Sequence, residues 1–177
     1  MAFERNNISF INDVSSGCHD SDMLDVVSKL GCSYIMTHMP REHKEGSIKV
    51  YDDILSEIKT YFTDRIQKCV EAGISKEKII IDPGIGFGKS GENNINLLKN
   101  IKWLKTIHSN VCIGSSNKRY SSQLFKHIQT KEDLRIANLA TFATSTFYGV
   151  TYLRVHDVGL TKDTVLVISK AVELEQS

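Results

Sequence analysis

The stretch from Ile79 to Lys89 constrains the fold more than any other part of the chain. It reads IIIDPGIGFGK, so three isoleucines lead into Asp82, and Pro83 and three alternate glycines follow. A short apolar run that ends in a Pro/Gly cluster is typical of a buried strand and a tight loop. Asp82 is therefore predicted at the carboxyl end of a parallel strand, where α/β folds place their binding sites. The glycines would let the backbone approach whatever Asp82 binds.

The rest of the chain repeats the same alternation of strand and helix. Apolar runs ended by polar residues alternate five times with apolar positions spaced three or four residues apart. This order predicts a parallel sheet, in a (β/α) barrel or a doubly wound fold. A closed barrel takes eight strands and about 250 residues, more than 177 residues supply. The expected strands are 8–14, 33–37, 79–82, 111–114 and 151–155, and the expected helices are 20–30, 51–72, 94–108, 131–148 and 161–175.

Composition and charge disfavour several classes of protein. A content of 41% hydrophobic and 24% charged residues is ordinary for one globular domain, and a net charge of +1 gives no basic face for nucleic acid. The chain lacks an apolar run near the ~20 residues of a membrane span, and Met1–Asn7 does not resemble a signal peptide. Four scattered cysteines without a Cys-x-x-Cys pair favour reduced thiols. We therefore expect a cytoplasmic protein that binds neither nucleic acid nor membrane.

Polar residues follow each expected strand. Any one of them is more often a turn former or a helix N-cap than a ligand-binding group. The carboxyl ends of parallel strands meet at one rim, however, so the convergence of these residues predicts a site there. The groups are Asn12 and Asp13, then His38, then Asp82, then Ser116 and Lys118, and finally Arg154, His156 and Asp157.

Two of these strand ends leave alternatives open. Arg154 and His156 alternate along one strand and point to one face, which suits an anion such as phosphate. The other interpretation is a strand-end pair bonded to a neighbouring carboxylate such as Asp157. His38 has no partner at metal-ligand spacing, so no metal site is predicted from it.

Gly88-Lys89-Ser90 imitates a phosphate-binding loop. That motif reads G-x-x-x-x-G-K-[ST] and opens its helix at the lysine. Here Pro83 stands at the first glycine position, and the loop continues for three more residues before the helix. A phosphate-binding loop is therefore disfavoured.

Four motifs in order, INDVSSG, IIIDPGIGFGK, IGSSNK and RVHDV, resemble the carboxyl-terminal part of dihydropteroate synthase over essentially the whole chain. Pterin-dependent methyltransferases share the first motif but generally lack the Ser-x-Lys loop and RVHDV, so the synthase is preferred to a methyltransferase module. The resemblance implies a partial (β/α)8 TIM-type barrel: residues 1–177 would form a single pterin-binding domain that contains strands four to eight and is truncated at its amino-terminal side. It also implies a transferase of folate biosynthesis that condenses a dihydropterin pyrophosphate with p-aminobenzoate and releases pyrophosphate.

The resemblance assigns roles to individual residues. Asn12 and Asp82 would bind the edge of the pterin ring. Arg154 and His156 would hold the departing pyrophosphate together with a magnesium ion, and Lys118 would reach the pterin carbonyl beside the aminobenzoate. The catalytic roles would fall to Lys118, Arg154 and His156. The remaining implied contacts are Val14 and Gly114 along the pterin slot, Phe87 between the two substrate pockets, and Ser116 near the aminobenzoate.

The sequence also departs from the family pattern. Ser116-Asn117-Lys118 replaces Ser-Arg-Lys, and Thr37 stands where a methionine usually precedes His38. The Asn-x-Thr-x-Asp-Ser-Phe and Ser-Thr-Arg-Pro loops of the family's first strands do not occur in this sequence, and the first loop helps to hold magnesium. We therefore expect little or no condensation activity from these residues by themselves.

A partial barrel has consequences for assembly. MAFERNNI reads as the tail of a helix before the family's fourth strand, so the strands that begin at Ile8 and Thr151 would both be sheet edges. Exposed apolar surface of this kind favours a homodimer through the last helices or a separately encoded amino-terminal half. A gene remnant without catalytic function is the other interpretation.

Overall fold

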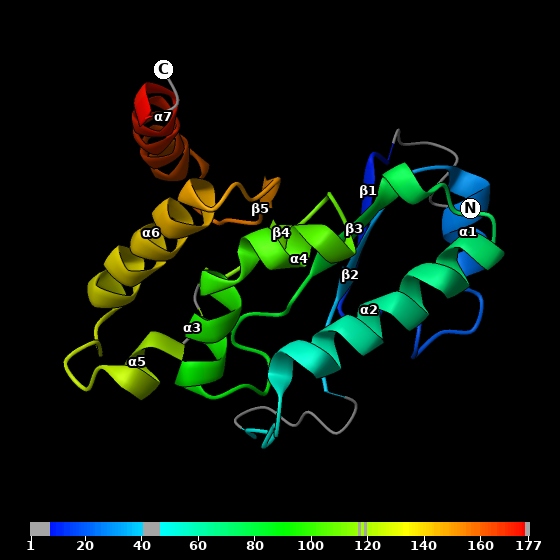
Figure 1. Cartoon of the computed structure of the whole chain (residues 1–177), viewed down its shortest axis with the longest axis horizontal. Helices are drawn as coiled ribbons and strands as arrows, with labels where there is room; N and C mark the ends of the chain where they lie inside the picture. The colour runs from blue at the N-terminus through cyan, green and yellow to red at the C-terminus, as the bar shows by residue number, and fades with distance from the viewer. Residues whose placement is uncertain (1–7, 41–46, 117, 119, 176–177) are drawn as a thin grey trace.

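The computed structural model describes residues 8–40, 47–116, 118 and 120–175, and these alternate between strands and helices as the sequence predicts. Figure 1 shows the strands in the middle of the molecule, with α1 and α2 on one side and α6 and α7 on the other. The elements are β1 (Phe10–Asp13), α1 (Met23–Leu30), β2 (Ser33–Thr37), α2 (Ile54–Glu71), the short 3-10 helix η2 (Lys76–Lys78), β3 (Ile79–Asp82), α3 (Gly91–Lys99), α4 (Ile101–Ile107), β4 (Cys112–Ile113), α5 (Tyr120–Leu124), α6 (Lys131–Phe147), β5 (Tyr152–Leu153) and α7 (Val158–Glu175).

Each strand pairs in parallel with its neighbour in the sequence. One sheet has the order β1-β2-β3, a second pairs β4 with β5, and a parallel bridge between Ile81 and Val111 links the two. A doubly wound sheet reverses its strand order, whereas a (β/α) barrel adds each strand beside the last. The observed order is therefore that of a partial barrel, and the predicted fold class is confirmed.

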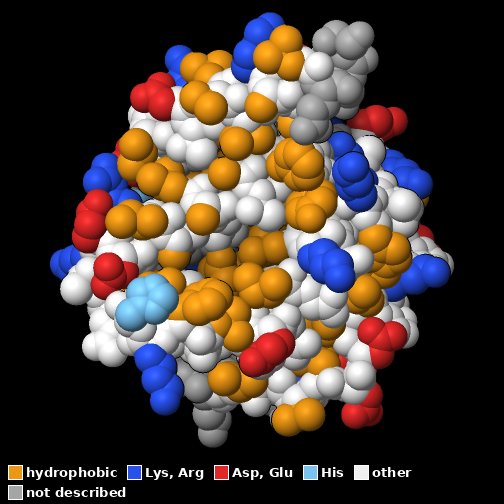
Figure 2. All heavy atoms as spheres, turned by 60° about the vertical axis from the view of Figure 1, so that its left-hand side comes forward, with side chains coloured by type: hydrophobic (Ala, Val, Ile, Leu, Met, Phe, Trp, Pro, Cys, Tyr) orange, Lys and Arg blue, Asp and Glu red, His pale blue; other side chains and the backbone are white. Residues whose placement is uncertain are grey.

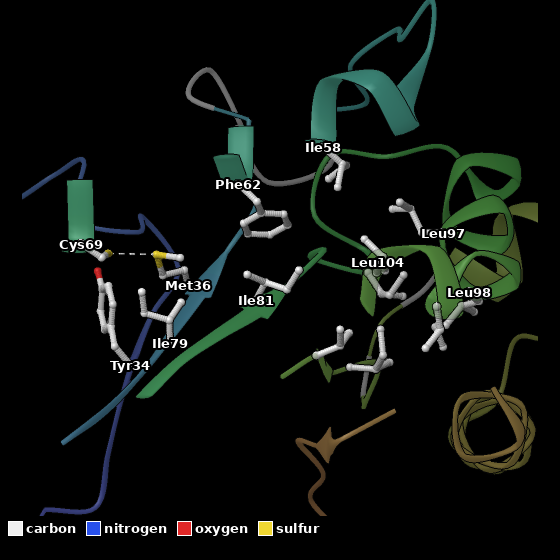
Figure 3. Packing of buried hydrophobic residues seen from close by; sticks show 14 of the residues in the cluster. Tyr34, Met36, Ile58, Phe62, Cys69, Ile79, Ile81, Leu97, Leu98 and Leu104 are labelled. Atoms are coloured by element: carbon white, nitrogen blue, oxygen red, sulfur yellow. Dashed lines mark hydrogen bonds between the residues drawn. The ribbon is translucent and has the colours of Figure 1, made fainter. Parts of the chain in front are cut away.

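The core lies between the strands and the helix faces that cover them. Helix α2 buries residues at three- and four-residue spacing, as an amphipathic helix does. Its side chains meet those that point outward from β2 and β3, while α3 and α4 extend the same core toward β4 (Figure 3). The labelled members of this cluster are Tyr34, Met36, Ile58, Phe62, Cys69, Ile79, Ile81, Leu97, Leu98 and Leu104.

Four helix predictions need correction. Helix α1 begins at Met23 rather than at residue 20, and α7 begins at Val158 rather than at residue 161. The expected helix 94–108 is two helices that meet at Asn100, whose side-chain amide donates to the Asn96 carbonyl at 2.8 Å. Both halves bury their apolar residues in the same core, so the apolar spacing gives no sign of the break. The expected helix 51–72 begins at Ile54, because the Asp53 carboxylate caps it by accepting from the N–H groups of Leu55 and Ser56. Helix α5 was not predicted, since five residues are too few to show a period.

The first and last strands are edges, as expected. Within the described residues β1 pairs only with β2, and β5 pairs only with β4. Their side chains nevertheless meet, because the rings of Phe10 and Tyr152 pack edge to face with centroids 6.1 Å apart. The expected helix tail in residues 1–7 and the departure at Asn117 lie outside the described residues.

Two further expectations concern the cysteines and the membrane. All four cysteines are free thiols, and three of them are buried. Among the helices of the described ranges, none combines the length and the apolar character needed to cross a bilayer.

Candidate functional site

The loops that follow four of the strands enclose a cavity of about 340 Å³. Eight of the nine predicted site residues line it, and the ninth, Asp82, lies beneath it with no exposed surface. Val155 is the one lining residue that was not predicted. The structure therefore brings the predicted residues together, while their individual roles stay predictions. The lining residues are Asn12, Val14, Phe87, Gly114, Ser116, Lys118, Arg154, Val155 and His156.

Asp82 is a buried carboxylate with a hydrogen-bonding partner on each oxygen. Its Oδ1 accepts from the Gly84 N–H at 2.8 Å, and its Oδ2 lies 2.8 Å from Nη1 of Arg154. The Thr37 hydroxyl also donates to Oδ2, at 3.4 Å. Burial raises the pKa of Asp82, and the charge of Arg154 opposes this rise. The residue that replaces the family's methionine thus supplies a hydroxyl donor to the carboxylate.

Arg154 crosses the floor of the cavity. Besides Asp82, its Nη1 donates to Oδ1 of Asn12 at 2.7 Å. The guanidinium lies against Gly114, where an added Cβ would be only 2.5 Å from Nη2. A glycine is therefore required at 114 for this arrangement. Arg154 is thus bonded to a carboxylate, as the alternative interpretation held, but the partner is Asp82 rather than Asp157, which bonds Arg135 at 3.3 Å.

His156 and Ser116 form the opposite part of the rim. The backbone N–H of His156 donates to Oγ of Ser116 at 3.3 Å, which joins the loops after β5 and β4. His156 is exposed and lines the same cavity as Arg154, as the alternation of the two residues predicted.

Lys118 and Phe87 form a cation–π pair at the mouth of the cavity. The Lys118 Nζ lies 3.5 Å from the centroid of the Phe87 ring. Burial and the charge of Arg154 lower the pKa of Lys118, while Asp82 raises it. Gly86, at φ +78°, makes room for this lysine, since a Cβ there would lie 2.9 Å from the Lys118 Cβ. The glycine loop therefore positions both members of the pair.

The sequence reasoning missed the structural role of Lys89. Its buried Nζ donates to the backbone carbonyls of His38 at 3.0 Å, Gly84 at 2.9 Å and Phe87 at 3.1 Å. Burial lowers the pKa of this amine to about 7, although the charge of Asp82 opposes the shift. The Gly-Lys-Ser sequence was the available signal, but it was tested only as a phosphate-binding loop. The lysine instead fixes the glycine loop to the end of β2.

A metal site is not assembled in the part of the chain that the structure describes. No group of three or more His, Cys, Asp or Glu residues lies together there. His38 is buried, with Nε2 3.7 Å from a Glu57 carboxylate oxygen, and it lines a separate cavity of about 550 Å³. The described residues do not provide a ligand set for the expected magnesium ion, which stays a prediction from the resemblance.

The chain matches the family model described as "Pterin binding enzyme" over residues 1–156. It is 30% identical over 170 residues to the dihydropteroate synthase of Escherichia coli K12, an alignment that covers 94% of the chain and 58% of that relative. The dihydropteroate synthase of Xanthomonas albilineans solved with 4-aminobenzoic acid superposes with a TM-score of 0.83 at 34% identity, covering 93% of the chain and 60% of that structure. The same enzyme in complex with 7,8-dihydropteroate gives a TM-score of 0.80, also at 34% identity, covering 93% and 59%. The chain thus spans about three fifths of the length of these proteins.

Proposed function

The chain belongs to the family of pterin-binding enzymes, and we propose that it supplies the pterin- and pyrophosphate-binding part of a dihydropteroate synthase. Its reaction in that role is the condensation of a dihydropterin pyrophosphate with p-aminobenzoate. Residues 1–177 are inferred to act as one pterin-binding unit in the cytoplasm. The solved relatives with 4-aminobenzoic acid and with 7,8-dihydropteroate support this choice of substrates.

The observation that carries the proposal is the cavity with acceptors at its floor and cations beside them. A buried carboxylate at Asp82 and the Asn12 amide oxygen suit the N–H donors along one edge of a flat ring. Arg154 and His156 line the same cavity and suit an anion. A ring that carries donors at one edge and a pyrophosphate on a short arm fits both requirements.

The proposed chemistry follows from this arrangement. The C–O bond between the pterin methylene and pyrophosphate breaks, and the pyrophosphate leaves with the bonding electrons. The aromatic amine forms the new C–N bond and then loses a proton. Arg154 and His156 would stabilise the charge that develops on the leaving group. Phe87, with Lys118 over its ring, would hold the flat substrates in register.

We expect low turnover from these 177 residues by themselves, because the loops of the family's first strands are not found in this sequence. Large apolar side chains are exposed on α6 and α7, and Figure 2 shows hydrophobic groups over the face that carries them. This surface supports a homodimer through the last helices, with a separate amino-terminal half as the other occupant. Sedimentation of the purified chain as a monomer at micromolar concentration would argue against the homodimer.

Calorimetric titration with the dihydropterin pyrophosphate tests the proposal. Asp82→Ala should weaken binding about tenfold or more, because it leaves buried donors of the ring without an acceptor. Asp64→Ala is the matched control, since Asp64 is 53% exposed and pairs with Lys68 on the surface of α2. An unchanged affinity in Asp82→Ala, or no binding by the unaltered chain, would overturn the proposal.

A further inference from the structure

Arg154 controls access to the buried carboxylate in the candidate site. Asp82 has no exposed surface, whereas the Arg154 side chain is 34% exposed and lines the cavity directly above it. The same nitrogen, Nη1, lies 2.8 Å from Asp82 Oδ2 and 2.7 Å from Asn12 Oδ1. A ligand that donates to Asp82 Oδ2 and Asn12 Oδ1 therefore meets acceptors to which this guanidinium is already bonded.

Because Arg154 is bonded to both acceptors, two requirements of the proposed function are in conflict. The pterin ring needs the acceptors on Asn12 and Asp82, and one nitrogen of Arg154 is bonded to both of them. The pyrophosphate, in contrast, needs the guanidinium itself. The ring and Arg154 therefore compete for the same acceptors, while the anion and the acceptors compete for Arg154.

We propose that Arg154 is an internal ligand of the pterin acceptors and that the anionic arm of the substrate draws it away. The inference rests on the proposed function and makes Arg154 a specificity-determining residue, because a ring with a pyrophosphate binds far better than the ring by itself. When the ring and the pyrophosphate bind together, the N–H groups of the ring replace the guanidinium as donors to Asp82, so the carboxylate keeps its hydrogen bonds. When a neutral ring arrives, the guanidinium loses its partners and gains only water.

The surroundings of Arg154 favour this exchange. Lys118 lines the same cavity, and its pKa is lowered in part by the charge of Arg154, so the two cations repel each other. An anion placed between them relieves this repulsion. Thr37 and the Gly84 N–H remain bonded to Asp82 when Arg154 leaves, which limits the number of donors that the ring must replace.

The first test uses the unaltered chain and needs no variant. The probe is methyl dihydropterin, the same ring with a methyl group in place of the pyrophosphate arm, titrated with and without saturating inorganic pyrophosphate. Pyrophosphate should tighten binding of the ring about fivefold or more, and the ring should tighten pyrophosphate by the same factor. Equal or weaker affinity for the ring in the presence of pyrophosphate would overturn the inference.

The second test removes the guanidinium and keeps an unbranched, uncharged side chain. Arg154→Met should bind methyl dihydropterin more tightly and lose the effect of inorganic pyrophosphate, yet it should bind the pyrophosphate ester about tenfold or more weakly. Arg135→Met is the matched control, because that arginine pairs with Asp157 outside the cavity and should change neither affinity.

The outcomes separate this inference from the proposed function. If the unaltered chain binds neither the ring nor its pyrophosphate ester, the proposed function fails. If it binds the ester but Arg154→Met weakens both ligands, the site stands and the internal-ligand inference fails. If Arg154→Met does not fold, the titrations of the unaltered chain still decide the question.

Discussion

The largest predicted effect on stability concerns Lys89, whose Nζ is buried beneath the glycine loop. Lys89→Met removes the donor to three backbone carbonyls, those of His38, Gly84 and Phe87. Each buried acceptor left without a partner costs about 1–3 kcal/mol, and the apolar methionine recovers part of that by avoiding burial of a charge. We expect a net loss of about 3–5 kcal/mol in the free energy of unfolding. Urea titration followed by fluorescence of Trp103, the one tryptophan, measures it.

Lys105→Met is the matched control for this change. The Lys105 Nζ donates to a single carbonyl, that of Gly149 at 2.7 Å, from an exposed position. Water can replace that donor, so a loss of about 1 kcal/mol or less is expected. The reasoning is refuted if Lys89→Met costs no more than Lys105→Met. It is supported further if the Lys89 variant also weakens binding of the dihydropterin pyrophosphate, because the loop carries Phe87.

Two further predictions concern the glycine loop and the loss of stability at acidic pH. Gly86→Ala, at φ +78° and with a Cβ 2.9 Å from that of Lys118, should cost about 1–3 kcal/mol and weaken pterin binding. Gly31→Ala, at φ +60° and 3.6 Å from the nearest atom, should show the strain without the change in calorimetric affinity. Burial raises the pKa of Asp13, but hydrogen bonds from Tyr34, Ser15 and Gly17 outweigh it and lower the pKa below 3.8. Its stabilising effect is therefore present above pH 4 and lost as the pH falls through the folded pKa. The stability advantage over Asp13→Asn in urea titrations should shrink from pH 5 to pH 3, and a constant difference would contradict this account.

The order of the strands and the longer helices was predictable because each type has its own apolar pattern. The strands contain short apolar runs, and the helices carry apolar residues three or four positions apart. The runs at 33–37 and 79–82 each contain three successive apolar residues, and the structure places β2 and β3 there with the predicted bounds. Boundaries set by a single side chain were harder to predict. Asp53 caps the start of α2 and Asn100 lies between α3 and α4, each through hydrogen bonds of its own side chain. The spacing of apolar residues gives no sign of such bonds.

The membership of the site was predictable for a different reason. Residues at the carboxyl ends of parallel strands converge at one rim whatever the exact bounds of the strands, so Asn12, Ser116 and His156 line one cavity even though β4 and β5 have only two residues each. The internal contacts were not predictable. Nothing in the sequence shows that Arg154 reaches Asp82 rather than Asp157, because that choice depends on the curvature of the sheet.

Among the described residues, the same contact links the two strands at the edges of the sheet. Asn12 lies near the end of β1 and Arg154 directly follows β5, 142 residues apart, yet their side chains are 2.7 Å apart. The rings of Phe10 and Tyr152 meet one layer below, so the two edges are linked by an apolar contact and by a polar contact above it. In a closed barrel, neighbouring strands maintain this curvature through backbone hydrogen bonds. Between β1 and β5 of the described residues, side chains make the link instead, and Arg154 joins it to Asn12 and Asp82, the acceptors that we propose bind the pterin.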